Sequence, residues 1–420
     1  MEKHSCWEQS APVREKLIYF LKWLALSVIV GLVAGGIGGC FARALGWVTA
    51  FRGKNDYLIY FLPLAGLVIV FLYQKLLKHD GGTNQVLATV HAKDTIPGIA
   101  APMIFFSTLM THLFGGSAGR EGAALQLGGS LGNTLAKLFR LDRNDTGIAV
   151  MCGMSAAFAA VFGTPMAAAI FAMEVASIGI LHASALFPCV ISALLGAELS
   201  GLLGQKPEHF TVLEIPGFEL RSAALTVLVA ALTALVSMLF CFVLHRAGTL
   251  SRAWLENPYL RVLLGAEIVV LAAWILGNQD YCGASVGLIE RALEGRTEWY
   301  SFLLKLLLTA ATMGFGFKGG EIVPAFCVGA TFGCLVGQVL GFSPSLCAAC
   351  GMIALFCGAT NCPLASLLIA IEMFGFAGMP YYLLTVAVSY GMSGYTGLYH
   401  EQIIVYSKYK TRFINRKTAD

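Results

Sequence analysis

Glu121 is an acidic residue in an otherwise apolar part of the chain, within the sequence Gly119-Arg120-Glu121-Gly122. A carboxylate at membrane depth is costly, and by default it marks a pathway for ions or protons. A run that can form a helix, residues 123–139, follows it. The N–H groups exposed at the start of a helix attract anions. An ionised carboxylate beside such a site can occupy the site and must leave when it is protonated. One residue can therefore link the movement of an anion to that of a proton.

Further segments place polar or glycine-rich backbone where apolar helices are expected. Residues 80–85 contain Asp, Thr and Asn, which are good N-cap residues, and glycines that let the backbone turn. In residues 316–324, Pro324 suits the first turn of a helix and Glu321 precedes it. Tyr399 comes shortly before a basic tail. Each feature also has a plainer interpretation, as a loop cap, a surface carboxylate or a tyrosine at the membrane interface.

The composition identifies the setting of these residues as a membrane. Of the 420 residues, 57% are hydrophobic and only 12% are charged, and the mean hydropathy is +0.74. Soluble globular proteins carry about 25% charged residues, so this chain has too little polar surface for a water-soluble protein of its size. The apolar stretches are continuous rather than alternating, which argues against a transmembrane β-barrel. The sequence predicts an all-α protein that crosses the membrane several times.

The apolar segments fall into two classes by length. Crossing a bilayer takes about 20 residues, and the clear spanning candidates are residues 17–45, 57–77, 223–245 and 261–277. Others are short or interrupted by glycine and proline, namely residues 98–113, 123–139, 147–161, 322–340 and 347–358. We expect these to be half-helices or strongly tilted helices. Non-helical backbone at that depth is tolerated only inside protein or beside a water-filled cavity.

The chain contains an internal repeat. The sequence Cys-Gly-Met at residues 152–154 recurs at residues 350–352, and at the same spacing GTPMAAAIFAMEV corresponds to NCPLASLLIAIEM, which aligns Glu174 with Glu372. Matching short, broken segments in two halves are typical of the substrate site of a secondary transporter. The predicted organisation is an N-terminal segment 1–15, a first membrane repeat 16–204, a linker 205–221, a second membrane repeat 222–399 and a basic tail 400–420.

Basic residues gather at both ends of the chain: Lys3, Arg14, Lys16, Lys408, Lys410, Arg412, Arg416 and Lys417. Although the net charge is only +4, this placement puts both termini in the cytoplasm by the positive-inside rule. No cleavable signal peptide is visible, because the first residues are polar and the first apolar run is longer than a signal-peptide core.

The cysteines raise a different class of hypothesis. Cys347 and Cys350 form a CxxC motif, with Cys357 and Cys362 beyond it, so an intramembrane enzyme or a metal-dependent redox protein is conceivable. The surrounding run is apolar and carries no His or Asp, and the chain has no HExxH motif. We expect no enzyme activity, no bound metal and no cofactor.

Taken together, these segments resemble the CLC family of anion channels and transporters over nearly the whole chain. GREGA at residues 119–123 is similar to the family's GREGP loop, whose glutamate is the external gate. GGEIVP at residues 319–324 is similar to its GGxFxP segment, and the two repeated strings are similar to its xxPLAGxxFxxE helices. Tyr399 falls where the family has its anion-coordinating tyrosine. The resemblance implies an inverted repeat, a homodimer with one pore per subunit, and cytoplasmic ends.

The chain departs from the common family pattern in ways that point to one branch. The family's GSGIP loop is replaced by GTNQV at residues 82–86, Val175 stands at the position of the inner proton glutamate, and a glutamate appears instead at Glu321. This pattern resembles the bacterial CLC-F branch of fluoride/proton antiporters. It implies export of fluoride in exchange for protons across a bacterial inner membrane, with no nucleic-acid partner. The alternative is a chloride/proton antiporter or a passive anion channel of the same fold.

The resemblance also implies roles for individual residues. Glu121 and Glu321 are candidates for gating and proton coupling. The candidate anion-binding residues are Thr83, Asn84, Gly119, Arg120, Gly122, Ile322, Val323 and Tyr399. Fluoride is small and holds its water strongly, so its site must supply strong donors at close range. A threonine hydroxyl, an asparagine amide and helix N-terminal N–H groups can do so.

Other ionisable residues lie in or near the predicted spans. Glu174 and Glu372 end apolar helices at symmetric places, where a structural capping role competes with a role in transport. Glu267 lies inside residues 261–277 and needs a partner or water. We expect His112 at the membrane interface, and Arg120 is also a candidate structural partner of Glu121.

Overall fold

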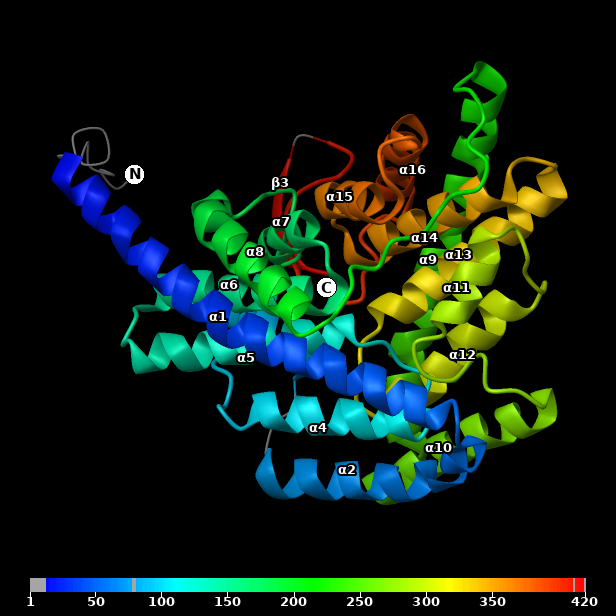
Figure 1. Ribbon diagram of the computed structural model, residues 1–420, viewed down its shortest axis with the longest axis horizontal. Coiled ribbons are helices and arrows are strands. Elements are labelled where there is room, and N and C mark those ends of the chain that lie inside the picture. The colour runs from blue at the N-terminus through cyan, green and yellow to red at the C-terminus, as the bar shows by residue number, and fades with distance from the viewer. Residues whose placement is uncertain (1–12, 78–80, 411, 419–420) are drawn as a thin grey trace.

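The computed structural model describes residues 13–77, 81–410 and 412–418 of the chain (Figure 1). Most of the expected N-terminal segment, and Asp80 of the first glycine-rich segment, lie outside these residues. Within them, 7 helices are long and apolar enough to cross a membrane: Val13–Arg52, Asp56–Leu76, Arg143–Phe162, Ala183–Leu202, Leu220–Trp254, Pro258–Leu276 and Ile322–Leu340. The protein is therefore a mostly helical, multi-pass membrane protein, as the composition predicts.

The order of the helices repeats along the chain. The first series is α1 (Val13–Arg52), α2 (Leu62–Leu76) after the short η1 (Asp56–Phe61), α3 (Gly82–Val90), α4 (Ala100–Leu113), α5 (Glu121–Leu138), α6 (Arg143–Phe162), α7 (Pro165–Glu174) and α8 (Leu186–Leu202) after η2 (Ala183–Ala185). The second series is α9 (Leu220–Trp254), α10 (Pro258–Leu276), α11 (Val286–Leu293), α12 (Ser301–Gly314), α13 (Ile322–Leu340), α14 (Pro344–Thr360), α15 (Pro363–Phe374) and α16 (Met379–Met392). A long helix opens each series, and a short helix beginning with proline, α7 or α15, comes seventh. The exact boundaries of the predicted repeats stay a prediction.

Two of the segments that we grouped as short or interrupted form helices long enough to span a membrane. α6 has 20 residues and α13 has 19. α6 begins upstream of the apolar run because the Asp142 side chain caps it by accepting a hydrogen bond from the backbone N–H of Asp145. The hydrophobic pattern locates the apolar part of such a helix but misses its polar first turn.

Glycines bring the paired helices of each half into backbone contact. A Cβ atom added to Gly128 of α5 would lie 2.1 Å from the carbonyl oxygen of Gly153 on α6. The corresponding contact in the second half joins Gly329 of α13 to the carbonyl oxygen of Gly351 on α14, at 2.4 Å. Small residues that permit such close packing are typical of helix interfaces in membranes. The repeated Cys-Gly-Met motif therefore marks the same interface twice.

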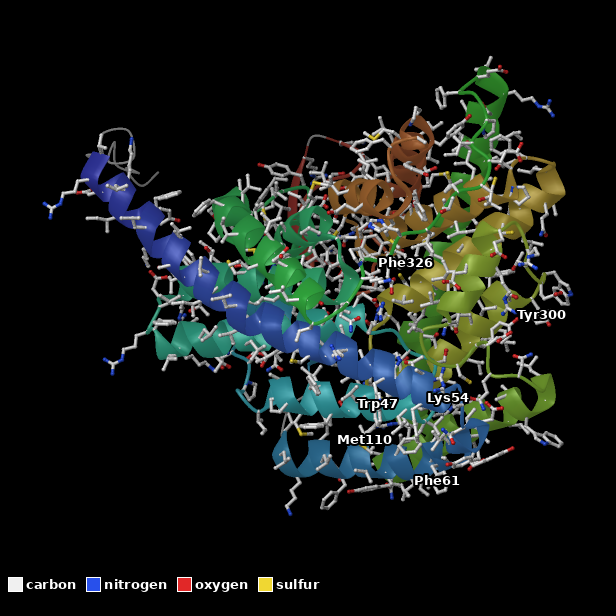
Figure 2. All side chains as sticks on the ribbon, viewed as in Figure 1. Trp47, Lys54, Phe61, Met110, Tyr300 and Phe326 are labelled. Atoms are coloured by element: carbon white, nitrogen blue, oxygen red, sulfur yellow. The ribbon has the colours of Figure 1, made fainter. Side chains whose placement is uncertain are left out.

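Aromatic side chains fill the centre of the molecule and also cover its outside. Phe326 of α13 is 1% exposed and stacks on Phe162 of α6, with 5.6 Å between ring centroids (Figure 2). Trp47 at the end of α1 and Phe61 in η1 lie on the outside, at 67% and 47% exposure (Figure 2). Large apolar side chains on the outside of spanning helices are the surface expected to face lipid.

The predicted basic tail forms strands. β1 (Ser177–Ile178) pairs in parallel with β2 (Ile403–Tyr406), which pairs antiparallel with β3 (Phe413–Lys417). Ile404 is fully buried in this small sheet. The expectation of an all-α fold missed these strands, because each is too short to show an alternating pattern that stands out from a membrane sequence.

The linker between the two helix series is an extended segment fastened along the second half (Figure 1). The backbone N–H of Phe210 donates to the carbonyl of Met373, and the N–H of Leu213 donates to the Ser345 hydroxyl. The Tyr381 hydroxyl donates to the carbonyl of Gly217. These contacts hold the linker in place although it contains no helix.

Candidate functional site

The two glycine-rich loops predicted from the sequence meet in the structure. One precedes α5 and the other precedes α13, and they pair by backbone hydrogen bonds. The N–H of Gly119 donates to the carbonyl of Gly320 at 2.7 Å, and the N–H of Gly320 donates to the carbonyl of Gly119 at 2.8 Å. The first N–H groups of a helix have no acceptor within the helix. The pairing therefore brings two helix N-termini, one from each half, to a single place.

The loops approach each other too closely for side chains at their glycines. A Cβ atom on Gly320 would lie 2.5 Å from the backbone nitrogen of Gly122, and one on Gly119 would lie 2.8 Å from Cδ of Pro324. This contact explains why glycines lie beside both glutamates in the sequence, at Gly122 and Gly320. Gly119, Gly122, Ile322 and Val323, all predicted to bind the anion, lie together at this junction.

Glu121 is fully buried, and its carboxylate folds back over the start of its own helix. One carboxylate oxygen accepts a hydrogen bond from Nε of Arg120 at 3.1 Å, and the other accepts from the backbone N–H of Arg120 at 3.2 Å. Arg120 also forms an ion pair with Glu208 of the linker. Sequence reasoning missed Glu208, because nothing in a polar linker indicates which distant arginine it contacts.

Glu321 lies on the other side of the loop contact. A Cβ atom on Gly122 would be 3.0 Å from its Oε2 atom. This oxygen is buried and has no hydrogen-bond partner among the described residues. A buried carboxylate oxygen without a partner is costly, so Glu321 is suited to bind a proton, a water molecule or another polar species here.

Tyr399 presents a second unpartnered group. Its side chain is 2% exposed, and its hydroxyl has no hydrogen-bond partner in the part of the chain that the structure describes. The adjoining Leu398 is held by a hydrogen bond from its N–H to the carbonyl of Ala359 in α14. Tyr399 lies within electrostatic range of the Glu321 carboxylate. The predicted tyrosine thus lies near the predicted glutamate.

Thr83 and Asn84 lie at the start of α3, where they connect two other parts of the site. The Thr83 hydroxyl oxygen accepts a hydrogen bond from Nε2 of Gln126 on α5 at 3.0 Å. The Asn84 side-chain oxygen accepts from the N–H of Glu401 at 3.1 Å, two residues beyond Tyr399. In both contacts the oxygen accepts, so the Thr83 hydroxyl hydrogen and the Asn84 amide hydrogens remain able to donate. Gln126 was not predicted.

A buried lysine supports the loop that carries Glu121. Lys305 of α12 is fully buried, and its Nζ donates to the Ser117 hydroxyl at 3.0 Å, the Gly283 carbonyl at 2.7 Å and the Ser285 hydroxyl at 2.9 Å. Sequence reasoning overlooked Lys305, although a single lysine within an apolar helix is a signal in its own right. It fixes Ser117, four residues before Glu121.

The prediction that His112 lies at the membrane interface is wrong. Its side chain is 2% exposed, and a ring nitrogen lies 3.1 Å from the carbonyl oxygen of Gly119. His112 therefore packs against the loop that contains Gly119. It can do so because α4, which carries His112, ends at Leu113, shortly before that loop.

The symmetric glutamates cap each other's helices. The two carboxylate oxygens of Glu174, at the end of α7, accept from the N–H groups of Leu364 and Ala365 at the start of α15, at 3.1 and 2.9 Å. The equivalent oxygens of Glu372 on α15 accept from Met166 and Ala167 at the start of α7, at 3.0 and 2.8 Å. The predicted capping role is what the geometry supports, and it operates across the two halves.

The remaining candidates lie away from this junction. Val175 is buried after Glu174, and its carbonyl accepts a hydrogen bond from Nε2 of Gln402 at 2.9 Å. Glu267 is exposed on the outer surface of α10. Among the described residues, no three His, Cys, Asp or Glu side chains are grouped so as to hold a metal ion.

Comparisons with known proteins identify the family of the chain. The family model described as "Voltage gated chloride channel" matches residues 65–394. A "Chloride/fluoride channel protein" of Pseudomonas syringae pv. tomato is 35% identical over 94% of this chain and 89% of its own length. The "H(+)/Cl(-) exchange transporter ClcA" of Vibrio cholerae is 26% identical over 83% of this chain and 81% of its own length.

Solved structures extend the comparison to three dimensions. The "CLC-type fluoride/proton antiporter" superposes with a TM-score of 0.88 at 32% identity, covering 91% of this chain and 98% of the other. A "slow cyanobacterial Cl-/H+ antiporter" gives a TM-score of 0.76 at 17% identity, covering 88% of this chain and 94% of the other, and this likeness shows the fold alone. With its paired helix N-termini and this family match, the chain belongs to the CLC family of voltage gated chloride channels and related transporters.

Proposed function

We propose that this protein exchanges fluoride for protons across the membrane, with Glu121 as the protonatable gate. The observation that carries the proposal is a fully buried carboxylate that accepts the backbone N–H of Arg120, the N-cap residue of its own helix, beside a second helix N-terminus. The titles of two similar proteins, the Pseudomonas "Chloride/fluoride channel protein" and the solved "CLC-type fluoride/proton antiporter", support fluoride as the anion. Membership of the family places the chain among ion-transport proteins, not enzymes.

The chemistry of the gate follows from competition for one positive site. The ionised Glu121 carboxylate occupies the place where an anion would meet the helix N-termini. Protonation removes its charge, which weakens its hold on the Arg120 donors and lets the side chain leave. An anion can then enter, and it must depart before Glu121 loses its proton and returns. When Glu121 takes its proton from the side to which the anion leaves and releases it to the side from which the anion came, each cycle moves an anion and a proton in opposite directions.

The selection of fluoride requires donors that replace its tightly held water. Four groups supply them in this proposal: the Thr83 hydroxyl, the Asn84 amide, the Tyr399 hydroxyl, and the N–H groups of Ile322 and Val323. The unpartnered Tyr399 hydroxyl supports this role, because a buried donor without a protein acceptor is suited to an ion.

In this proposal Glu321 is the second ionisable residue of the transport pathway, after Glu121. Its unpartnered Oε2 can accept the proton that Glu121 releases, or it can steer the anion electrostatically. The usual inner position carries Val175, which cannot titrate. Proton transfer through the region of Val175 would therefore need other groups, and Glu321 is the nearer carboxylate to the Glu121 loop.

The proposal includes an assembly and an orientation. We infer a homodimer with one pathway in each subunit, in a bacterial inner membrane. Basic residues near both ends, including Arg14 and Lys417, support cytoplasmic termini by the positive-inside rule. The transported species are fluoride and protons, and no cofactor enters the mechanism.

Reconstitution into liposomes tests the substrate directly. With purified protein and a pH-sensitive dye inside the vesicles, an outward fluoride gradient is expected to drive protons inward. An equal chloride gradient is expected to move protons at least about tenfold more slowly, since one unfavourable interaction of about 1.4 kcal/mol suffices for that ratio. Equal proton fluxes with the two anions would favour the chloride/proton alternative. Anion flux without proton movement would favour a passive channel.

A further inference from the structure

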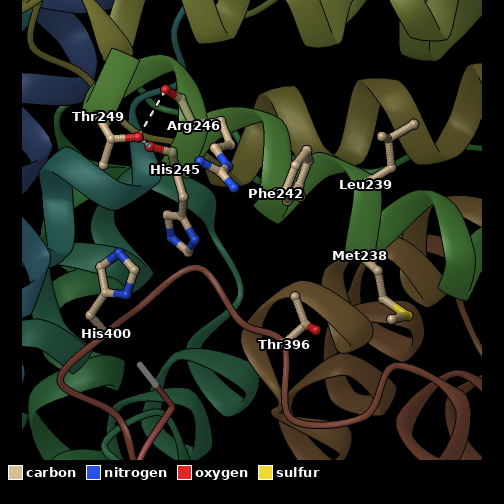
Figure 3. Close-up of a pocket in the computed structure, with 8 residues that line it drawn as sticks. All are labelled: Met238, Leu239, Phe242, His245, Arg246, Thr249, Thr396 and His400. Carbon is tan, nitrogen blue, oxygen red and sulfur yellow. Dashed lines mark hydrogen bonds between the residues drawn. The ribbon is translucent and has the colours of Figure 1, made fainter. Parts of the chain in front are cut away.

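A groove of about 580 Å³ lies between α9 and the segment that follows α16 (Figure 3). We call it the α9 groove and define it by Met238, Leu239, Phe242, His245, Arg246 and His400, which line it. None of these residues belongs to the Glu121 site. The groove is open to the outside of the molecule, where Phe242 is 56% exposed and Leu239 is 41% exposed.

The lining divides into an apolar and a basic part along the helix. Met238, Leu239 and Phe242 lie toward the middle of α9. His245 and Arg246 follow one turn later, toward the end of the helix at Trp254, and His400 faces them from the other side (Figure 3). On a spanning helix, an apolar surface that ends in a basic one is complementary to a lipid at the bilayer boundary. The apolar part suits the acyl chains, and the basic part suits an anionic headgroup.

The basic part has no acidic counterpart within the described residues. Arg246 stacks over Phe242, with 5.4 Å from its guanidinium carbon to the ring centroid, and forms no ion pair with any described carboxylate. The rings of His245 and His400 lie 4.0 Å apart between centroids. His245 donates from one nitrogen to the carbonyl oxygen of Leu398, so in its neutral form its other nitrogen can only accept a hydrogen bond. Arg246 and His400 are therefore the groups suited to bind an anion here.

The combination of an apolar and a basic part suits an amphipathic anion better than a small soluble anion. Inorganic phosphate could meet the basic part, but it would leave the apolar part uncovered. A phospholipid with an anionic headgroup covers both, and basic pockets between membrane helices are known to bind such headgroups. We propose that the α9 groove binds an anionic phospholipid, with its phosphate at Arg246 and His400 and its acyl chain along Leu239 and Phe242.

Bound lipid would touch the segment that carries Tyr399. His400 follows Tyr399 in the chain, and the contact of His245 with the Leu398 carbonyl fixes the residue before it. A lipid phosphate bridging Arg246 of α9 and His400 therefore ties that segment to a spanning helix from the outside. The lipid site does not depend on which anion is transported.

Native mass spectrometry of the purified protein tests the proposal without any transport measurement. The probes are dioleoyl-phosphatidylglycerol and dioleoyl-phosphatidylcholine, which share their acyl chains and differ in net charge. The wild-type protein is expected to retain the anionic lipid in preference. Arg246→Gln is expected to weaken its retention about fivefold, the effect of about one basic residue at a lipid surface. His400→Gln in the same chain should weaken it further.

Arg252→Gln is the matched control, because Arg252 lies on the same helix, is exposed and does not line the groove. It should retain the anionic lipid as the wild type does. Equal retention of the two lipids by the wild type would overturn the proposal. So would an equal loss in Arg252→Gln and Arg246→Gln, which would indicate general surface attraction.

A second arm separates the lipid from its headgroup. Leu239→Asp places a repelling charge on the apolar part and is expected to abolish lipid retention while the exposed position spares the core. Inorganic phosphate at millimolar concentration should not compete with the lipid. Full competition by phosphate, or unchanged retention in Leu239→Asp, would show that no acyl chain occupies the groove and would overturn the assignment.

Discussion

Two pairs of glutamates lie at helix ends in this protein, and they differ in symmetry. Glu174 and Glu372 each accept two backbone N–H groups from the start of the other's helix, with nearly the same distances in both directions. Glu121 and Glu321 lie at the central junction and are not equivalent. Glu121 is bonded to Arg120 through both oxygens, whereas Oε2 of Glu321 has no partner among the described residues.

The register of the two halves explains the difference. α5 begins at Glu121 and α13 begins at Ile322, so by position in the repeat Glu121 corresponds to the apolar Ile322, and Arg120 corresponds to Glu321. Glu174 and Glu372 occupy equivalent positions in the two halves, and each of their carboxylate oxygens accepts a hydrogen bond, as expected for a structural role. Glu121 and Glu321 do not occupy equivalent positions, and Oε2 of Glu321 has no hydrogen-bond partner among the described residues. Departure from internal symmetry therefore coincides with the two residues that we propose as the proton-binding groups.

The largest effect is expected at Glu121. Glu121→Gln should abolish fluoride-driven proton movement, because an amide cannot take up and release a proton at neutral pH. The measurement is the pH change inside proteoliposomes under a fluoride gradient. Glu267→Gln, which neutralises an exposed carboxylate on α10, should leave coupling intact. Proton movement that persists in Glu121→Gln would refute the gate assignment.

Glu321→Gln should reduce proton-coupled fluoride flux by about tenfold or more, because a hydrogen bond to a charged group is worth about 1.5–3 kcal/mol. The initial rate of fluoride release, measured with a fluoride electrode, gives the factor. Melting temperature is the control, and it should be unchanged or slightly raised, since the substitution removes a buried charge with an unsatisfied oxygen. An unaltered rate would reduce Glu321 to a helix-capping residue.

Substitution of Glu174 or Glu372 should lower the thermal stability of the protein and leave the coupling of protons to fluoride unchanged. Glu174→Gln keeps one oxygen acceptor and replaces the other with a donor that faces an N–H group, which costs about 1–3 kcal/mol. Thermal unfolding in detergent should fall accordingly, and Glu372→Gln should act in the same direction. The number of protons moved per fluoride should stay constant in both variants. A changed ratio would give the outer pair a part in transport and would end the distinction drawn above.

The smallest effect is expected at Glu208, which contacts Glu121 only through Arg120. Its ion pair is partly exposed, at 18% and 19% for the two side chains, and such pairs contribute about 0–1 kcal/mol. Glu208→Gln should change the fluoride rate by less than about fivefold, with coupling retained. High salt should reduce the difference from wild type. A complete loss of coupling would show that Arg120 depends on Glu208 to position the gate.

The sequence predicts the helical fold correctly and offers candidate site residues, because the signals for both are local. A glutamate flanked by glycines, a proline at a helix start and a repeated Cys-Gly-Met each need only a few neighbouring residues to be noticed. Glu121 and Glu321 lie near each other because Gly119 pairs with Gly320. No local sequence pattern reveals that pairing.

The missed residues share one physical cause, since each acts through a partner far away in the chain. Gln126 contacts Thr83, Glu208 contacts Arg120, and Lys305 contacts Ser117. The strand β2 pairs with β3 nearby and with β1, which lies more than 200 residues earlier. Such contacts depend on tertiary packing, which hydrophobic periodicity does not encode.

The mutual capping of α7 and α15 has a consequence for biosynthesis. When the ribosome has completed the first helix series, the N–H groups of Met166 and Ala167 have not yet met Glu372, and Glu174 has not met α15. Unsatisfied backbone groups are costly in lipid, so we expect these groups to be hydrated until translation has passed Glu372. A chain that ends before Glu372 should then be degraded in the membrane faster than the full-length chain.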